Sequence, residues 1–194
     1  MLFVKYALNC YTQTMQKRLY VTIDLPDGIR ESFLREEKRW KNLNVFWTGF
    51  SHYRLTLEYL GVADKEGLKT VRDTLDDLSR DTAPFEVRLD RIVLGPDAKD
   101  PKMFWATIYE DAAVKRFRKE LRERLEVAGF KYPEKEFTPH IVLASAKGNQ
   151  LKGKQTDVHL RGKFPVDHVN LYSSQAYAKG SAKYKLVDAF SLDK

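Results

Sequence analysis

The sequence predicts an α+β fold, built mostly from antiparallel sheet, with two lobes around a central cleft. Two observations predict it. Strand patterns and helix patterns follow one another in the order strand, helix, strands, helix, strands, helix, strands. In addition, residues 51–61 and 137–148 look like two copies of one strand, each alternating polar or small residues with aliphatic ones. Because the copies lie in different halves of the chain, we expect them to face each other across the cleft, related by a pseudo-two-fold axis.

The elements of the first half follow from hydrophobic spacing. In order, we predict a strand over 19–25, a turn at 26–28, a helix over 29–40, a strand over 51–61 and a helix from 64 to the breaker at 82–84. The strands rest on period-two alternation. Asp64 is the expected N-cap of the second helix, because its side chain can accept a hydrogen bond from the first turn.

The second half repeats this alternation of strands and helices. We predict strands over 85–94 and 103–109, a helix over 114–125, the second motif strand, and final strands over 164–173 and 184–192. Gly129 stands where a left-handed residue would end the helix. The basic residues on this helix alternate with acidic ones, which is typical of a solvated face.

Length and composition are those of a globular protein. The chain has 194 residues, 43% of them hydrophobic, which suits one bilobal domain over 17–194 preceded by an extension over 1–16. The net charge of +7 favours anionic partners such as nucleic acid, although a merely soluble basic surface explains it equally well. Cys10 is the only cysteine, which fits a reducing compartment. We therefore expect a cytoplasmic monomer that does not bind membranes.

The two similar strands carry the polar residues that suggest chemistry. In the first, His52, Arg54 and Thr56 are expected to share one strand face. In the second, His140 occupies the slot that Arg54 occupies in the first. Four side chains from two facing strands could thus reach one ligand.

These motifs resemble those of the two-histidine phosphoesterase superfamily, specifically the bacterial and archaeal RNA 2′,3′-cyclic phosphodiesterases, also called 2′-5′ RNA ligases. The resemblance runs from Lys17 to the C-terminus and rests on four landmarks: residues 19–26, Trp47, residues 57–61 and residues 137–140. It implies a two-lobed fold around a cleft. It also implies one motif in each lobe that reads His, any residue, Thr or Ser, then an aliphatic residue.

Carried over position by position, the resemblance finds only half of the family's motif residues. The first-motif histidine falls on Arg54 and its threonine on Thr56. The second-motif histidine falls on His140, but its threonine falls on Val142, and an arginine found in many members falls on Ser145. The resemblance therefore implies His140 as the catalytic group and Arg54 and Thr56 as phosphate-binding groups.

The replacement of one histidine changes the expected chemistry. Opening a cyclic phosphate with water needs a base for the water and an acid for the departing ribose oxygen, and two imidazoles supply both without a metal or a cofactor. An arginine guanidinium cannot act as a base, although it can bind two phosphate oxygens. Losing one proton-transfer group costs about 10²- to 10⁴-fold in rate. We therefore expect weak activity or none.

Three hypotheses for function remain open. The first is an RNA 2′,3′-cyclic phosphodiesterase-like protein that binds, and slowly hydrolyses, RNA or nucleotide ends with a cyclic phosphate. The second is an inactive module that only binds such ends. The third is an active phosphodiesterase that pairs His52 with His140 on a different substrate, although His52 would lie about 6.6 Å along the strand from Arg54. Non-functional readings also stand: Arg54 could reach to solvent, His52 could be a surface histidine, and His140 could be a core histidine.

Aromatic residues near the first motif allow two interpretations. Trp47, Phe50, Tyr53 and Tyr172 could stack on a nucleobase. Aromatic residues on short strands are more often part of the core, and we expect that here. His159 and His168 belong to no motif, so ordinary surface or sheet positions explain them.

Overall fold

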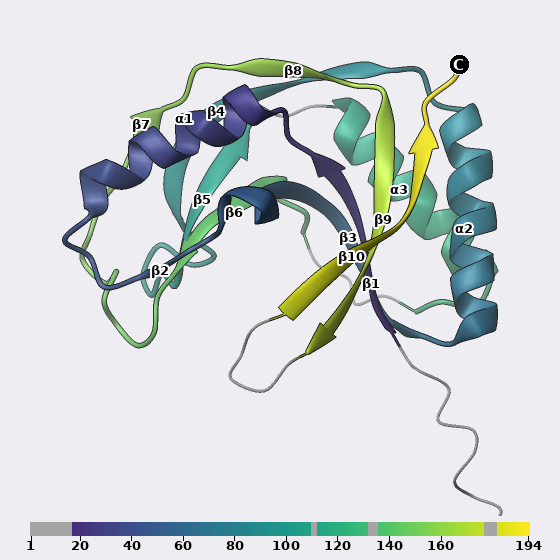
Figure 1. Cartoon of the computed structure of the whole chain (residues 1–194), viewed down its shortest axis with the longest axis horizontal. Coiled ribbons are helices and arrows are strands. Elements are labelled where there is room, and N and C mark those ends of the chain that lie inside the picture. The colour runs from purple at the N-terminus through teal and green to yellow at the C-terminus, as the bar shows by residue number, and fades with distance from the viewer. Residues whose placement is uncertain (1–16, 110–111, 132–135, 177–181) are drawn as a thin grey trace, which may run out of the picture.

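The computed structural model describes residues 17–109, 112–131, 136–176 and 182–194, so the extension over 1–16, with Cys10, lies outside the described residues. Its strands form two sheets in which neighbouring strands pair antiparallel (Figure 1). The four-stranded sheet has the order β10-β9-β1-β3, from β1 (Lys17–Asp24), β3 (Arg54–Ala63), β9 (His168–Ala176) and β10 (Ala182–Ser191). The second sheet has the order β2-β6-β5-β4-β7, with β8 also pairing with β4, from β2 (Phe46–Trp47), β4 (Phe85–Gly95), β5 (Met103–Ile108), β6 (His140–Ser145), β7 (Val158–His159) and β8 (Lys163–Val166).

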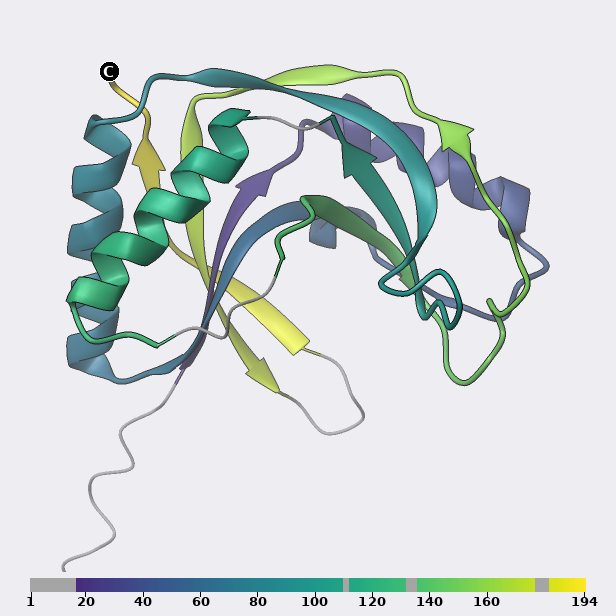
Figure 2. The ribbon, with the colours of Figure 1, turned by 180° about the vertical axis from the view of Figure 1, so that it is seen from behind.

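Helices cover the outer sides of the sheets. Helices α2 (Lys65–Arg80) and α3 (Ala112–Val127) pack on each other and against the four-stranded sheet, as Figure 2 shows. Helix α1 (Asp27–Glu37) lies on the side of the second sheet and continues into the 3₁₀ turn η1 (Lys38–Trp40) (Figure 1). No helix among the described residues is both long and apolar enough to cross a bilayer.

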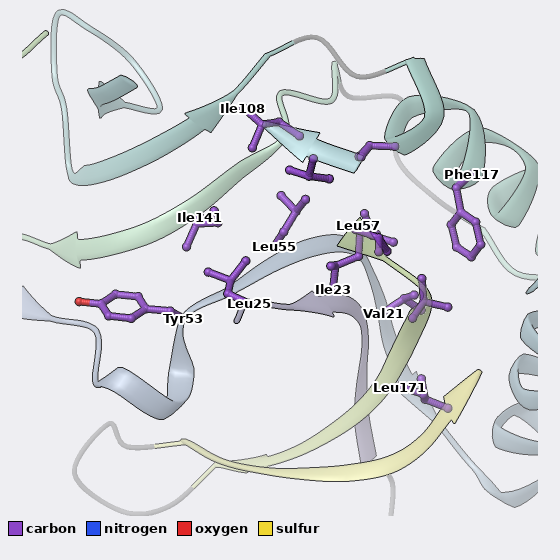
Figure 3. Packing of buried hydrophobic residues seen from close by; sticks show 14 of the residues in the cluster. Val21, Ile23, Leu25, Tyr53, Leu55, Leu57, Ile108, Phe117, Ile141 and Leu171 are labelled. Carbon is purple, nitrogen blue, oxygen red and sulfur yellow. The ribbon is translucent and has the colours of Figure 1, made fainter. Parts of the chain in front are cut away.

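One hydrophobic core joins the two sheets. Leu55 and Leu57 of β3 are almost fully buried and lie in the same cluster as Ile141 of β6 and Ile108 of β5 (Figure 3). Burying aliphatic side chains from both sheets contributes about 1.5–3 kcal/mol for each. The common core thereby fixes the two motif strands, β3 and β6, relative to each other.

The local signals read from the sequence are mostly confirmed. The Asp64 side chain accepts a hydrogen bond from the Gly67 amide at 2.9 Å, as an N-cap should. Gly129, after α3, has a φ of 93°, the left-handed conformation that favours glycine. The strands expected over 85–94 and 103–109 are β4 and β5.

Several boundaries were wrong. The turn expected at 26–28 is the start of α1, because proline lacks the amide hydrogen that a first helical turn leaves unpaired. The strand expected over 164–173 is two strands that are separated at Asp167. The first, β8, pairs with β4, and the second, β9, pairs with β1 in the other sheet. The first motif strand begins only at Arg54, since Phe50–His52 form the 3₁₀ turn η2.

The pairing of β3 with β1 contains a bulge that no periodic pattern indicates. Thr56 pairs with Thr22, but Glu58 pairs with Val21 and Tyr59 with Tyr20, so Leu57 is an extra residue. An extra residue reverses the faces of the side chains that follow it. Glu58 is therefore buried on the helix side, and Tyr59 lies on the opposite, cleft side.

Buried Glu58 has two arginine partners on α3. Arg118 Nη2 and Arg122 Nε lie 2.9 and 2.8 Å from Glu58 Oε2, and both arginine side chains are largely buried. Desolvation lowers the pKa of Arg118, and the carboxylate opposes that shift. The prediction that the basic residues of this helix face solvent is thus wrong for Arg118 and Arg122, because their counter-ion comes from a distant strand.

Candidate functional site

A cleft of about 720 Å³ lies between the two sheets, and all the predicted site residues line it. These are His52, Arg54, Thr56 and His140, together with the replaced positions Val142 and Ser145. Arg54 and Thr56 come from β3 of the four-stranded sheet, whereas His140 starts β6 of the second sheet. The expectation that the two motif strands contribute to one cleft is therefore met.

Cross-strand pairing arranges the cleft face of the four-stranded sheet in rows. Asp24 pairs with Arg54, Thr22 pairs with Thr56, and Tyr20 pairs with Tyr59. Directly opposed residues in an antiparallel pair point to the same face. Charged, hydroxyl and aromatic side chains thus follow one another along the cleft.

Arg54 is held by neighbours from four elements, and its side chain is only 11% exposed. Its Nη2 donates to the Ser51 carbonyl at 2.9 Å, and its Nε lies 3.8 Å from Asp24 Oδ1. The guanidinium carbon lies 4.1 Å from the Tyr172 ring centroid and 5.1 Å from that of Tyr184, which are cation–π distances. The side chain does not extend freely into solvent.

The guanidinium of Arg54 is only partly hydrogen-bonded. Nε and Nη1 are buried without a hydrogen-bond partner among the described residues. Buried donors are normally paired, and leaving one unpaired costs about 1–3 kcal/mol. Because Nε already faces the Asp24 carboxylate, Nη1 is the donor better suited to an incoming acceptor such as a phosphate oxygen.

Tyr172, the ring nearest to the guanidinium of Arg54, keeps its phenolic proton at neutral pH. The Tyr172 hydroxyl donates to Asp24 Oδ2 at 2.7 Å. Burial, and then this hydrogen bond, raise the pKa of Tyr172 to about 12. Tyr172 and Asp24 together therefore orient the guanidinium without supplying a proton to the cleft at neutral pH.

His140 has a defined tautomer and a defined ring orientation. Its Nδ1 lies 2.7 Å from the Thr138 carbonyl, which can only accept, so Nδ1 carries the hydrogen and Nε2 has a free lone pair. The ring stacks on Trp105 of the neighbouring strand, with centroids 3.8 Å apart and an interplanar angle of 19°. Burial lowers the pKa of His140, and the Thr138 hydrogen bond partly opposes this. The ring is consequently a neutral acceptor near pH 7.

The hydroxyl groups of the cleft include one that the motif comparison missed. Thr56 is exposed in the cleft, while Thr22 Oγ1, across from it on β1, is buried and has no partner among the described residues. Val142 in the second motif has no hydroxyl to offer. Thr22 belongs to the first strand, where its polar side chain between Val21 and Ile23 was the only available signal.

His52 lies in the cleft but not in the way its sequence position indicates. It ends the turn η2, so it does not share a strand face with Arg54, and that prediction was wrong. Its exposed ring lies 5.9 Å from the Tyr184 ring, centroid to centroid. Tyr184 is therefore an aromatic neighbour that His52 and Arg54 share.

Most aromatic residues considered as stacking candidates do not line the cleft, in line with the expectation that they belong to the core. Tyr53 is fully buried, packs on Phe33 and donates a hydrogen bond to Glu37, so it belongs to the core. Phe50 does not line the cleft, whereas Trp47 does. The tyrosines that line it, Tyr20, Tyr59 and Tyr184, were not singled out in the sequence.

A metal site is not evident in the described part of the chain. Among those residues, no group of three or more His, Cys, Asp or Glu side chains is placed to hold an ion. The cleft instead presents a guanidinium, hydroxyl groups and the two imidazoles of His52 and His140.

Comparison with known proteins identifies relatives of this chain. The family model described as the 2′-5′ RNA ligase superfamily matches residues 51–178. A Methanocaldococcus jannaschii protein named RNA 2′,3′-cyclic phosphodiesterase is 29% identical over 170 residues, which cover 84% of this chain and 94% of the relative. A Bacillus subtilis protein of the same name is 23% identical over 126 residues, covering 64% and 69% of the two chains.

Solved structures support the same assignment of the fold. The crystal structure of TT0787 of Thermus thermophilus matches with a TM-score of 0.81 and 25% identity, over 91% of this chain and 98% of that one. E. coli LigT complexed with 3′-AMP matches with a TM-score of 0.74 and 21% identity, over 92% and 99% of the two chains. The predicted two-lobed, mostly antiparallel α+β fold is confirmed. Because the family model spans more than half of the chain and both motif strands, the chain belongs to the 2′-5′ RNA ligase superfamily of two-histidine phosphoesterases.

Proposed function

We propose that the cleft binds RNA or nucleotide ends carrying a 2′,3′-cyclic phosphate and hydrolyses them slowly. The observation that carries this proposal is that Arg54, Thr56 and His140 line one cleft, and that Arg54 Nη1 has no hydrogen-bond partner among the described residues. Two further findings support it. The relatives are named RNA 2′,3′-cyclic phosphodiesterases, and the related LigT has been crystallised with 3′-AMP and with ATP.

In the proposed reaction, His140 is the general base. Its free Nε2 takes a proton from water as the water oxygen attacks phosphorus. One bond from phosphorus to a ribose oxygen breaks, and that oxygen finally takes a proton, which leaves a phosphate monoester and a free hydroxyl. Arg54, Thr56 and Thr22 would donate to the nonbridging oxygens, where negative charge accumulates.

Slow turnover follows from the group at position 54. Arg54 can stabilise negative charge on the departing oxygen, but an arginine does not release a proton at neutral pH. The proton on the leaving group must then come from solvent. A binding-only module is the second candidate function, and it is favoured by the same replacement together with the missing hydroxyl at Val142.

Removal of the Arg54 side chain is expected to weaken binding of the cyclic phosphate. Hydrogen bonds to a charged group contribute about 1.5–3 kcal/mol, so Arg54→Ala should lower affinity for adenosine 2′,3′-cyclic phosphate by about 10- to 100-fold. Isothermal titration calorimetry measures this. Arg88→Ala is the matched control, because Arg88 is an exposed arginine on β4 that pairs with Glu86 outside the cleft. Equal affinities in the two variants would contradict the proposal.

The pH dependence of hydrolysis distinguishes the candidate proton donors. Because burial lowers the pKa of His140, the neutral base is already formed at pH 7, and kcat/KM should fall only as the pH drops below about 6.5. No fall is expected on the alkaline side up to about pH 9, since an arginine does not titrate there. A rate profile over this range provides the measurement. A second, descending limb near neutral pH would contradict this assignment and favour His52 as the acid.

The remaining expectations stay part of the proposal. We take residues 17–194 as one bilobal unit, which the common hydrophobic core supports. We also retain the expectation of a cytoplasmic monomer without a cofactor. Size-exclusion chromatography with light scattering tests the oligomeric state.

A further inference from the structure

We propose that Arg118 of α3 is a positioning residue that ties the two motif strands together and thereby fixes the ring of His140. This inference rests on the proposed function, in which His140 is the base. Arg118 belongs to neither motif and does not line the cleft, so it would act on the reaction only through the groups that it holds.

On the side of the four-stranded sheet, Arg118 holds the bulge of β3. Its Nε donates a hydrogen bond to the Leu57 carbonyl at 3.1 Å, and its Nη2 lies 2.9 Å from Glu58 Oε2. The extra residue of a bulge is left out of the ladder of strand pairing, so its backbone needs another partner. Because this bulge directly follows Thr56, Arg118 fixes the strand just beyond the phosphate-binding residues.

On the other side, the same guanidinium contacts the segment that leads into β6. Its carbon lies 4.3 Å from the ring centroid of Phe137, which is a cation–π distance. Phe137 directly precedes Thr138, whose carbonyl lies 2.7 Å from His140 Nδ1. The contacts therefore run from the β3 bulge through Arg118 to the carbonyl that sets the tautomer of His140.

Neutralising Glu58 does not account for all the contacts of Arg118. Arg122 Nε lies 2.8 Å from the same carboxylate oxygen, so Glu58 keeps a cation without Arg118. The contacts with Leu57 and Phe137 involve no negative charge. They use the fixed donor directions and the flat face of a guanidinium, which a lysine lacks. Arg118 is thus a connector between the two strands as well as a counter-ion.

The test reads the tautomer of His140 by nitrogen-15 NMR of the histidine rings, in protein without substrate and at about pH 8, where the ring is neutral. The signals that disappear in His140→Ala identify this ring, and in the wild-type protein they should show the hydrogen on Nδ1. Arg118→Met removes the guanidinium but keeps a long apolar side chain. It should give a mixture with the Nε2–H tautomer, because the Thr138 carbonyl is no longer held.

Two further variants make the result specific. Arg124→Met is the matched control and should leave the tautomer unchanged, because Arg124 lies on the same helix but pairs with Asp81. Phe137→Leu removes the stacking ring while the contacts of Arg118 with β3 remain. It should change the tautomer as Arg118→Met does, and it carries the test if Arg118→Met does not fold.

Kinetics provide a second measurement. Misplacing a catalytic group by about 1 Å can cost about 100-fold in rate, so Arg118→Met should lower kcat for hydrolysis by up to that factor. KM should change little, because Arg54 still binds the phosphate. A variant that is only less stable would lose activity in proportion to its unfolded fraction and would keep the wild-type tautomer in the folded one.

The outcomes separate this inference from the function on which it rests. An unchanged Nδ1–H tautomer in folded Arg118→Met or Phe137→Leu would overturn the positioning role, and so would an equal change in Arg124→Met. A wild-type ring with its hydrogen on Nε2 would also overturn it. A wild-type protein that does not hydrolyse the cyclic phosphate would overturn the proposed function, while the NMR comparison would still decide whether Arg118 fixes the ring.

Discussion

Replacing His140 with alanine is expected to reduce hydrolysis of a 2′,3′-cyclic phosphate by about 10²- to 10⁴-fold, the usual effect of removing a general base. The structure suits this imidazole to the role, because its Nδ1 hydrogen is engaged by Thr138 and its ring is stacked on Trp105. The loss should fall on kcat, with little change in affinity, because Arg54 and the threonines remain. The measurement is conversion of an oligonucleotide with a cyclic end into the ring-opened monophosphate.

Matched variants make this result specific. His159→Ala removes an exposed histidine on β7, outside the cleft, and should leave turnover unchanged. A thermal melt of His140→Ala shows whether the exposed face of Trp105 has weakened the fold. Turnover that survives in a folded His140→Ala protein would refute the proposed base. Loss of turnover in His52→Ala would instead support a His52 and His140 pair.

Replacing Arg54 with histidine is expected to increase turnover, by up to about 10²- to 10⁴-fold, because it restores a second proton-transfer group at the first-motif position. Position 54 already lines the cleft together with Thr56 and His140. An imidazole at this position would therefore face the same bound ligand. Affinity should fall at the same time, since the guanidinium donors are lost. The pH profile should become bell-shaped, with one limb from each histidine.

The control for this gain is Arg54→Gln, which removes the cation without adding a titrating group. If the two variants hydrolyse the substrate equally slowly, the missing histidine is not what limits turnover. Adding Val142→Thr to Arg54→His then tests whether the absent second hydroxyl is the limit. Faster hydrolysis by this double variant than by Arg54→His alone would show that the missing hydroxyl at Val142 on β6 also limits turnover.

Much of the fold was predictable from local patterns. Period-two alternation found β1, β4 and β5, and helical spacing found α2 and α3, because these elements bury one face against the core. The strand boundaries at η2 and at Asp167 were not predictable from such patterns. At η2 the chain turns before it enters β3, and at Asp167 it leaves β4 as its pairing strand and joins β1. These pairing strands are distant in sequence, so local alternation does not indicate the change.

The candidate site divides along the same line. His140, Arg54 and Thr56 could be chosen as candidates from the sequence, because they stand at corresponding positions of the two similar motif segments. The counter-ion and aromatic support of Arg54, from Asp24 and Tyr172, could not be chosen, because cross-sheet neighbours depend on pairing between remote strands. The bulge at Leu57 had no sequence signal for the same reason.

The sequence by itself determined which residues alternate along each strand, and hence that one motif carries an imidazole and the other a permanent cation. Only the tertiary structure decided that Glu58 is withdrawn to Arg118 and Arg122 while Tyr59 enters the cleft. The physical reason is that alternation is a property of a single strand, whereas register, bulges and burial arise from pairing and packing between strands.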